Sequence, residues 1–221
     1  MPAEAVLFDF NGTLSDDEPL LLRIFTELFA EHLNWRMSPD EYYTRLAGLS
    51  DEEIVRTAVT ERIGDSPDTV RLLLDRRRQR YRELFAERPT ITESALALVQ
   101  LLSERGIPQG IVTGASRIDV SYALSTVGIE DQFDALVCME DVHAGKPDPE
   151  GYLRGARELG IRPERTYVFE DSVPGLRAAR AAGMVGVAVV GTRPAGELRA
   201  EAHAVLDRLD TTAWQLLGEE N

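Results

Sequence analysis

Five short apolar runs alternate along the chain with stretches whose apolar residues recur at helical spacing. Strands that alternate with helices in this way are typical of βαβ units, in which helices cover a parallel sheet. We therefore predict an α/β fold with a doubly wound parallel sheet. The predicted strands cover residues 4–9, 109–113, 135–138, 166–170 and 185–190, and the predicted helices cover residues 94–105, 119–127, 149–159, 174–182 and 211–217.

Residues 17–87 follow a different pattern, because their apolar positions fit the helical period and none of their runs indicates a strand. Ser38, Ser50 and Ser66 each precede proline or acidic residues, which is typical of a helix start. We predict a helical domain over 17–87, inserted after the first strand, and a core domain formed by 1–16 and 88–221. The helices expected in the insertion cover residues 20–32, 40–46, 51–63 and 68–87.

Two charged segments in or beside this helical domain are expected to face solvent. Residues 16–18 are all acidic and lie in the first of the two predicted hinges between the domains, residues 15–19 and 88–92, and residues 76–78 are three consecutive arginines. Runs of like charge usually form the solvated face of a helix or a loop. We therefore assign neither segment to a binding site.

The composition narrows the classes of partner and compartment. The 221 residues carry a net charge of −14, whereas nucleic acids and anionic membranes attract basic surfaces. The single cysteine, Cys138, excludes an internal disulfide and is expected in the core. The sequence shows neither a basic leader nor an apolar run of the roughly 20 residues that a membrane span needs. We expect a cytoplasmic protein that binds neither nucleic acid nor membrane.

Lys146 is the only lysine among the 24 lysine and arginine residues. A bias toward arginine codons explains the arginines but not the one exception. Lysine is a compact point charge on a flexible stem, whereas arginine carries a broad planar fork. We interpret Lys146 as the small cation of a site, set against a phosphoryl oxygen or a carboxylate.

Polar residues follow four of the predicted strands. Asp9 ends the first strand, Thr113-Gly114 follows the second, Lys146 lies beyond the third, and Glu170-Asp171 ends the fourth. Parallel strands bring their carboxyl ends to one crevice, where open α/β sheets bind their ligands. Carboxylates are oxygen donors that suit Mg²⁺, and one of them can attack phosphorus to form an aspartyl-phosphate. The pattern predicts a phosphoryl site in which hydroxyl, amide and lysine donors surround the phosphoryl oxygens.

These residues, in this order, resemble the four motifs of the haloacid dehalogenase superfamily. The first motif is Asp9-Phe10-Asn11-Gly12-Thr13-Leu14, and residues 172–184 fit the usual continuation of the fourth. The insertion at 17–87 is similar to the helical cap of the phosphatase and phosphomutase branch. The resemblance covers nearly the whole chain. It implies a phosphoric monoester hydrolase that uses Mg²⁺ and acts on a small phosphorylated metabolite through an aspartyl-phosphate.

The resemblance also implies roles for particular residues. The catalytic residues would be Asp9, Asn11, Thr113 and Lys146, and the magnesium ligands would be Asp9, Asn11, Glu170 and Asp171. The substrate-binding residues would be Gly12, Thr13, Gly114, Ser116 and Arg117 in the core, with Arg45 and Gly48 in a stretch similar to the substrate-specificity loop of the cap.

Asn11 departs from the family pattern, because phosphatases and mutases usually carry a second aspartate there. That aspartate protonates the leaving group and then deprotonates the hydrolytic water, whereas an amide exchanges no proton. General acid–base catalysis contributes roughly 10²–10⁴-fold. The sequence leaves four explanations open: a slow phosphatase, a preference for good leaving groups, an accumulating phosphoenzyme, or an engineered residue. A nearly inert protein that only binds a phosphometabolite is the alternative function.

Other branches of the superfamily fit less well. The acid pair Glu170-Asp171 argues against a dehalogenase, which uses no metal, and the absence of lysine from 17–87 argues against a phosphonate-cleaving enzyme. A sugar phosphomutase is disfavoured because Leu21 stands where a histidine is usual, and Ala47 and Asp51 stand where basic residues would help. The identity of the substrate and the oligomeric state stay open.

Overall fold

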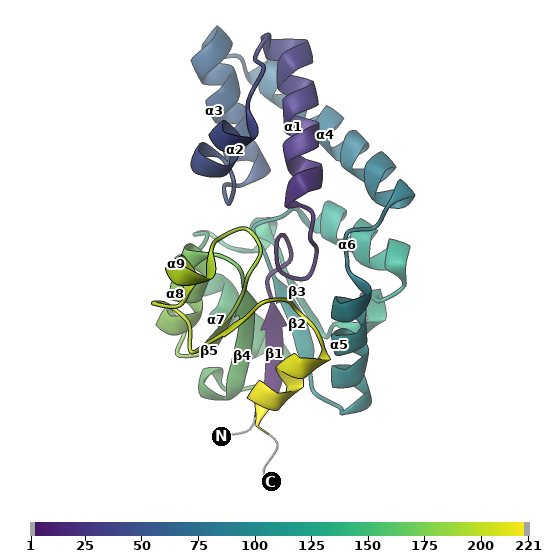
Figure 1. The fold of residues 1–221 in the computed structure, drawn as a ribbon, viewed down its shortest axis with the longest axis vertical. Coiled ribbons are helices and arrows are strands. Elements are labelled where there is room, and N and C mark those ends of the chain that lie inside the picture. The colour runs from purple at the N-terminus through teal and green to yellow at the C-terminus, as the bar shows by residue number, and fades with distance from the viewer. Residues whose placement is uncertain (1–2, 219–221) are drawn as a thin grey trace. The chain divides into compact units, whose positions relative to one another are not determined.

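The computed structural model describes residues 3–218, so residues 1–2 and 219–221 of the predicted core domain lie outside the described residues. The chain divides into two compact units, which are drawn together in Figure 1. The first unit comprises Met1–Asp16 and Thr90–Asn221, and the second comprises Asp17–Pro89.

The first unit is built on a six-stranded sheet in which every pair of neighbouring strands is parallel. The strand order is β3-β2-β1-β4-β5-β6, so the chain builds outward from β1 in both directions. This confirms the predicted doubly wound α/β fold, and it places the topological switch point at β1. The strands are β1 (Ala5–Phe8), β2 (Gln109–Val112), β3 (Ala135–Val137), β4 (Thr166–Glu170), β5 (Val185–Val189) and β6 (Ala204–Leu206).

Helices cover both faces of this sheet, as expected for strands that are apolar on both sides. Helices α7 and α8 pack on one face, over a core that includes Leu7, Val112 and Val168, while α5 and α6 lie on the other side of the sheet (Figure 1). The helices are α5 (Glu93–Glu104), α6 (Arg117–Val127), α7 (Glu150–Leu159), α8 (Val173–Ala181) and α9 (Ala195–Leu198). Short 3₁₀ turns are η1 (Glu130–Gln132), η2 (Met139–Asp141), η3 (Pro163–Arg165) and η4 (Thr211–Leu217).

The residue directly after β3 is Cys138, which the sequence predicts to lie in the core. Cys138 is fully buried, and burial raises the pKa of its thiol to about 12, which keeps it protonated and unreactive at neutral pH. Gln109, at the start of β2, is also buried and donates to the backbone oxygen of Val99 in α5 at 3.0 Å. The cysteine is therefore a core residue, as predicted.

The second unit consists of α1 (Glu18–Leu33), α2 (Pro39–Arg45), α3 (Asp51–Ile63) and α4 (Pro67–Glu87). Ser38 and Ser50 begin α2 and α3 with capping boxes: each serine hydroxyl accepts the backbone N–H of Glu41 or Glu53, and the carboxylate of that glutamate accepts the backbone N–H of the serine. Ser66 stands at the start of α4 without a side-chain capping bond. All three serines therefore begin helices where the sequence predicted them.

Two acidic residues predicted to be solvated at the hinge are instead buried in the second unit. The carboxylate of Asp17 accepts a hydrogen bond from the Tyr81 hydroxyl at 3.1 Å, and that of Glu18 accepts one from the Tyr42 hydroxyl at 2.8 Å. The tyrosines come from α4 and α2, far along the chain from their partners. The prediction was wrong for Asp17 and Glu18 because hydrogen bonds to distant tyrosines offset the cost of removing the carboxylates from water.

The arginine run at 76–78 is likewise divided between solvent and core. Arg76 is exposed, as expected, but Arg77 is only 3% exposed. Its guanidinium pairs with Asp51 at 3.0 Å and lies over the ring of Tyr81 at 4.8 Å from the ring centre. The prediction of a solvated face is therefore wrong for Arg77, which ties α4 to the start of α3.

Candidate active site

The carboxyl ends of the central strands position the residues that the sequence singled out. The backbone of Asp9 continues the ladder beyond β1, with its N–H donating to Phe169 at 3.0 Å. The backbone of Thr113 likewise continues β2, with its N–H donating to Val137 at 2.9 Å. Because strands β1, β2 and β4 are parallel and adjacent, these residues and the end of β4 meet at one edge of the sheet.

Lys146 connects two of these strand ends. Its Nζ atom donates to Asp9 Oδ1 and to Glu170 Oε1, each at 2.5 Å. The same nitrogen lies 5.3 Å from the centre of the Tyr152 ring, which is fully buried in α7. The lysine is thus held by two carboxyl groups and by the negative face of an aromatic ring. The only lysine of the chain occupies the position where a compact cation is needed.

Glu170 is satisfied by protein donors on both of its oxygens. Oε1 accepts from Lys146 and from the Tyr152 hydroxyl at 3.1 Å, while Oε2 accepts from the Ser172 amide at 2.9 Å and hydroxyl at 2.8 Å. A Cβ atom at Gly175 would stand 1.8 Å from Oε1, so the carboxylate needs a glycine beside it. These contacts place Glu170 where it can orient Lys146, and its predicted role as a magnesium ligand stays a prediction.

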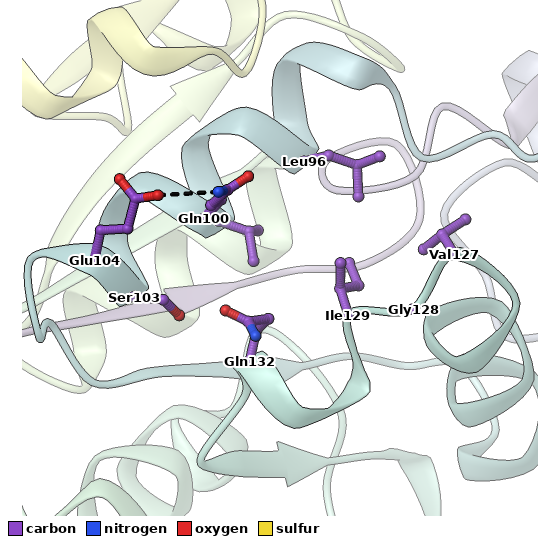
Figure 2. A pocket seen from close by; sticks show the side chains of 9 residues that line it. Leu96, Gln100, Ser103, Glu104, Val127, Gly128, Ile129 and Gln132 are labelled. Carbon is purple, nitrogen blue, oxygen red and sulfur yellow. Dashed lines mark hydrogen bonds between the residues drawn. The ribbon is translucent and has the colours of Figure 1, made fainter.

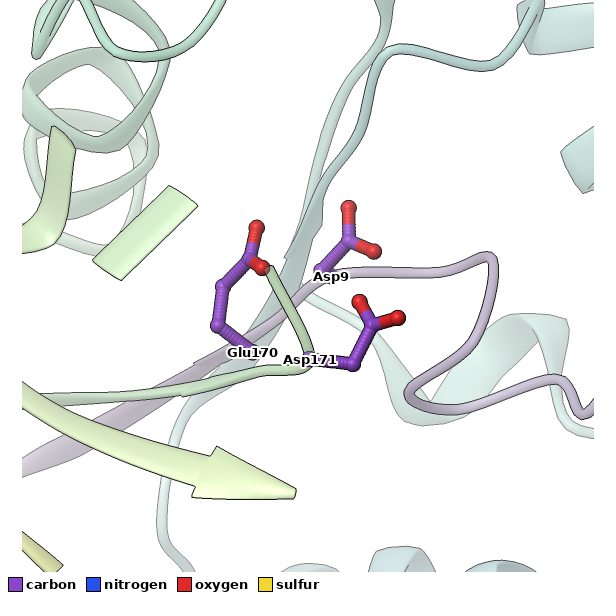
Figure 3. A group of neighbouring side chains, drawn as sticks. All are labelled: Asp9, Glu170 and Asp171. Atoms are coloured by element: carbon purple, nitrogen blue, oxygen red, sulfur yellow. The ribbon is translucent and has the colours of Figure 1, made fainter. Parts of the chain in front are cut away.

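Three buried carboxylates gather at this edge of the sheet, as Figure 3 shows. Asp9, Glu170 and Asp171 each offer an oxygen, and these oxygens lie within 4.8 Å of one another. Asp171 Oδ1 also accepts a hydrogen bond from the Thr13 hydroxyl at 3.3 Å. An all-oxygen set of this kind suits Mg²⁺, which prefers one or two carboxylates and keeps several waters. The residues present therefore fit a divalent cation.

The acidic cluster contains more carboxyl groups than positively charged side chains, and this imbalance shifts the pKa values of its members. Burial raises the pKa of Asp9 to about 8; Lys146 opposes this shift, while Glu170 and Asp171 add to it. Burial lowers the pKa of Lys146, but Asp9 and Glu170 outweigh it and hold that pKa well above its usual value. One lysine thus faces three carboxylates. A bound cation would favour the ionised form of Asp9, which is the form that can act as a nucleophile.

The turn after Asp9 brings backbone close to the cluster. Gly12 has φ +77°, and its N–H donates to the carbonyl of Ser15 at 2.7 Å, which closes the turn. A Cβ at residue 12 would stand 2.2 Å from Asp171 Oδ2, so glycine is required by both conformation and space. Asn11, half-buried, lies in this turn two residues after Asp9.

The predicted site residues after β2, Thr113, Gly114 and Ser116, differ in burial and in hydrogen bonding. Thr113 is buried, and its hydroxyl accepts the Ala115 N–H at 3.1 Å. Gly114 is exposed, and no atom would contact a Cβ there. Ser116 precedes α6, and its buried hydroxyl has no hydrogen-bond partner within residues 3–218.

Arg117 is engaged away from the cluster. Its guanidinium donates to the carbonyl of Leu136 at 2.9 Å and pairs with Asp141, and its N–H donates to Glu140. These contacts tie the first turn of α6 to β3 and η2. A role in substrate binding would require Arg117 to leave this ion pair.

Arg45 and Gly48 belong to the second unit, whereas the other predicted site residues belong to the first. Arg45 pairs with Glu61 at 2.6 Å on the exposed surface of that unit. Gly48 has φ +89° and open space around its Cα atom. Their predicted role in binding substrate stays a prediction.

Two residues that support the site were not identified from the sequence. Tyr152 holds Glu170 and underlies Lys146, as described above. Glu150 accepts the backbone N–H groups of His143 and Ala144 at 2.9 and 3.0 Å, which fixes the loop that carries Lys146. The only sequence signal for either residue is its position in the first turn of the helix that follows Lys146.

A groove elsewhere in the first unit contains no comparable chemistry (Figure 2). It lies between α5 and the turn from α6 to η1, and we call it the α5–α6 groove. Among the described residues that line it, Glu104 is the only one with a titratable side chain, and it accepts a hydrogen bond from Gln100 at 2.9 Å. The lining residues are Leu96, Val99, Gln100, Ser103, Glu104, Val127, Gly128, Ile129 and Gln132.

The arrangement is that of a haloacid dehalogenase-like hydrolase. The model of that family matches residues 6–189, so the chain belongs to it, and the recognition made from the motifs is confirmed. Among the described residues, no helix combines the length and apolar character that a crossing of the bilayer requires.

Two phosphatases are similar to this chain over nearly its whole length. A validoxylamine A 7'-phosphate phosphatase of Streptomyces hygroscopicus subsp. limoneus is 31% identical over 97% of this chain and 98% of its own length. A phosphorylated carbohydrates phosphatase of Thermotoga maritima is 30% identical over 91% of this chain and 92% of its own. The prediction of a phosphoric monoester hydrolase agrees with both names.

A solved structure shares both the fold and a related sequence. CbbY from Rhodobacter sphaeroides, in complex with phosphate, has a TM-score of 0.84 and 30% identity, and the match covers 94% of this chain and 95% of that one. The same protein is also known as a mutant in complex with xylulose-(1,5)bisphosphate, again with a TM-score of 0.84.

Proposed function

We propose that this chain is a Mg²⁺-dependent phosphatase that hydrolyses the phosphate monoester of a small metabolite. The observation that carries the proposal is the contact of Lys146 with Asp9 in the midst of the acidic cluster. A buried carboxylate, a compact cation and oxygen donors at one sheet edge are what phosphoryl transfer to a carboxylate needs. Membership in the hydrolase family and the names of the phosphatase relatives support the same conclusion.

Asp9 is the proposed nucleophile. An oxygen of its carboxylate would form a bond to phosphorus while the bond from phosphorus to the alcohol oxygen breaks, which leaves an aspartyl-phosphate. Lys146 would offset the negative charge that Asp9 and the phosphoryl group share, and the Thr113 hydroxyl would orient the phosphoryl oxygens. Water would then attack phosphorus while the bond from phosphorus to the Asp9 oxygen breaks, which releases inorganic phosphate and restores the carboxylate. Because Asn11 transfers no proton, the leaving alcohol oxygen would take its proton from solvent and the attacking water would lose one to solvent or to the released phosphate.

Asp9, Asp171 and the backbone carbonyl of Asn11 are the proposed ligands of Mg²⁺, with Glu170 acting mainly through Lys146. The bound ion would supply positive charge that neutralises the phosphoryl oxygens. Lys146 and the backbone N–H groups would then need to offset only the remaining negative charge of the phosphoryl group. The surplus of carboxylates over lysines in the cluster supports a cation at this position.

Asn11 gives the proposed enzyme its distinctive property. The amide can hold the leaving-group oxygen or the water by a hydrogen bond, but it transfers no proton. We therefore propose slow hydrolysis of ordinary alcohol esters and faster hydrolysis of esters whose leaving group needs no proton. The relatives act, by name, on phosphorylated carbohydrates and on validoxylamine A 7'-phosphate, so phosphorylated sugars and validoxylamine A 7'-phosphate are the first substrates to test.

The test is phosphate release from an aryl phosphate with and without Mg²⁺, for this chain and for Asp9→Asn. Asp9→Asn keeps the size of the side chain and removes the nucleophile, so we expect a loss of about 10⁴-fold or more. Asp16→Asn, an exposed residue at the end of the first segment of the core, is the matched control. A rate that survives in Asp9→Asn contradicts the covalent mechanism. No release from either chain, with phosphate ester bound, favours the binding-protein alternative.

A further inference from the structure

The loop that follows β5 lies against the turn that carries Asn11 and Gly12. A Cβ atom at Gly191 would stand 2.8 Å from the carbonyl oxygen of Gly12, so the two backbones are in close contact. A Cβ atom at Gly12 would in turn stand 2.5 Å from the hydroxyl oxygen of Thr192. The contact depends on glycine at both positions. It brings Thr192, which belongs to none of the four motifs, to the edge of the acidic cluster.

The Thr192 hydroxyl is buried and has no hydrogen-bond partner in the part of the chain that the structure describes. Buried hydroxyl groups are normally paired, and leaving one unpaired costs on the order of 1–3 kcal/mol. The cost of leaving the Thr192 hydroxyl unpaired is removed if the hydroxyl gains a hydrogen-bond partner when the acidic cluster binds a cation. The position of the hydroxyl indicates which carboxylate is that partner.

Asp171 is that carboxylate. A Cβ atom at Gly12 would lie 2.5 Å from Thr192 Oγ1 and 2.2 Å from Asp171 Oδ2. The two oxygens are therefore separated by no more than the sum of these two distances. The other carboxylate oxygen, Oδ1, accepts the hydroxyl of Thr13 at 3.3 Å. Two threonine hydroxyls from different loops are therefore assigned to the two oxygens of one proposed ligand.

We propose that Thr192 is a positioning residue for the metal site, an inference that rests on the proposed function. Its hydroxyl donates to Asp171 Oδ2, directly or through one bound water, when the cation is present. Hydrogen bonds of this kind fix the orientation of a ligating carboxylate, and their loss typically weakens metal affinity by about 10–100-fold. Thr192 acts through Asp171 and touches neither the phosphoryl group nor Asp9.

The experiment measures Mg²⁺ binding to the intact chain by isothermal titration calorimetry, in the absence of substrate. Thr192→Val keeps the shape of the side chain and removes the hydroxyl, whereas Thr192→Ser keeps the hydroxyl. We expect the Kd for Mg²⁺ to rise about tenfold in Thr192→Val and to stay near its starting value in Thr192→Ser. The unfolding temperature without metal should not fall in Thr192→Val, because an unpaired buried hydroxyl is removed. That result separates a positioning role from a merely structural one.

A second variant moves the hydroxyl without removing it. Gly191→Ala places a Cβ against the Gly12 carbonyl, so the loop must shift, and Mg²⁺ binding should weaken here too. Unchanged affinity in Thr192→Val overturns the inference. If Asp171→Ala abolishes binding while Thr192→Val does not alter it, only the inference about Thr192 fails. If the unaltered chain binds no Mg²⁺, the inference and the metal dependence of the proposed function fail together.

Discussion

The α5–α6 groove and the acidic cluster at the end of β1 and β4 are both features of the first unit, yet they differ in what fills them. The groove is a partly open hollow whose lining is mainly apolar and neutral (Figure 2). The cluster brings three buried carboxylates and a lysine together from segments more than 130 residues apart in the chain. Groups that are costly to bury and yet converge are evidence of chemistry, whereas a hollow alone is evidence only of imperfect packing.

Among these predictions, removal of the positive charge of Lys146 should have the largest effect on phosphate release. Lys146→Met leaves Asp9 and Glu170 without the donor that they share, so we expect phosphate release to fall about 10²–10³-fold or more. Lys146→Arg keeps the charge but not the compact shape and should recover little of the rate. Rates of phosphate release, with circular dichroism as the check on folding, measure both variants. Full activity in Lys146→Arg would show that charge alone is sufficient.

Asn11→Asp should change the rate in the opposite direction. The carboxyl group can protonate the leaving oxygen and later accept a proton from water, so we expect alcohol esters to be hydrolysed about 10²-fold faster or more. Aryl phosphates, whose leaving groups need less protonation, should gain less. The ratio of the two gains is the informative quantity. Equal gains for both substrates would exclude a role for residue 11 in protonating the leaving group.

Tyr152→Phe should have a smaller effect, because it removes a supporting hydrogen bond and keeps the ring beneath Lys146. The loss of one donor to Glu170 should lower the free energy of unfolding by about 0.5–1.5 kcal/mol and the rate by less than about tenfold. Urea denaturation and phosphate release measure the two quantities. Tyr167→Phe, on the same strand as Glu170, is the control and should change neither.

Substitution in the α5–α6 groove should have the smallest effect. Gln132→Ala alters a lining residue of η1 that lies outside every motif, so phosphate release should stay within about twofold of the unaltered chain. A larger loss would mean that the groove is coupled to the reaction. In that case, the contrast between the groove and the cluster would no longer separate shape from function.

The sheet and the motifs were predictable because the signals are local. The five predicted strands begin and end within one residue of the observed ones, and each motif residue ends a strand or lies in the loop that follows it. The strand β6 and the helix α9 were missed. Both are too short for a period to show, and β6 is an edge strand whose three residues are only half-buried.

The supporting contacts were not predictable, because each depends on a partner that is distant in sequence. The sequence predicts Glu18 to be a solvated charge because nothing in it indicates that Tyr42 lies beside this carboxylate. In the same way, Arg77 is part of a like-charged run in the sequence, and only the structure shows its pairing with Asp51. Thr192 carries no pattern at all; its place follows from the close approach of two glycine-containing loops. A single sequence shows which groups are costly to bury but not what compensates them.

The pairing of Lys146 with two carboxylates also makes the chain its own probe of local opening. Acylating reagents react with neutral amines, and the only side-chain amine of this protein is held protonated and hydrogen-bonded. Modification of Lys146 therefore requires that the pairing be broken first. The rate at which a small acylating reagent labels this one side chain would report how often the site opens, with no fluorophore and no engineered residue.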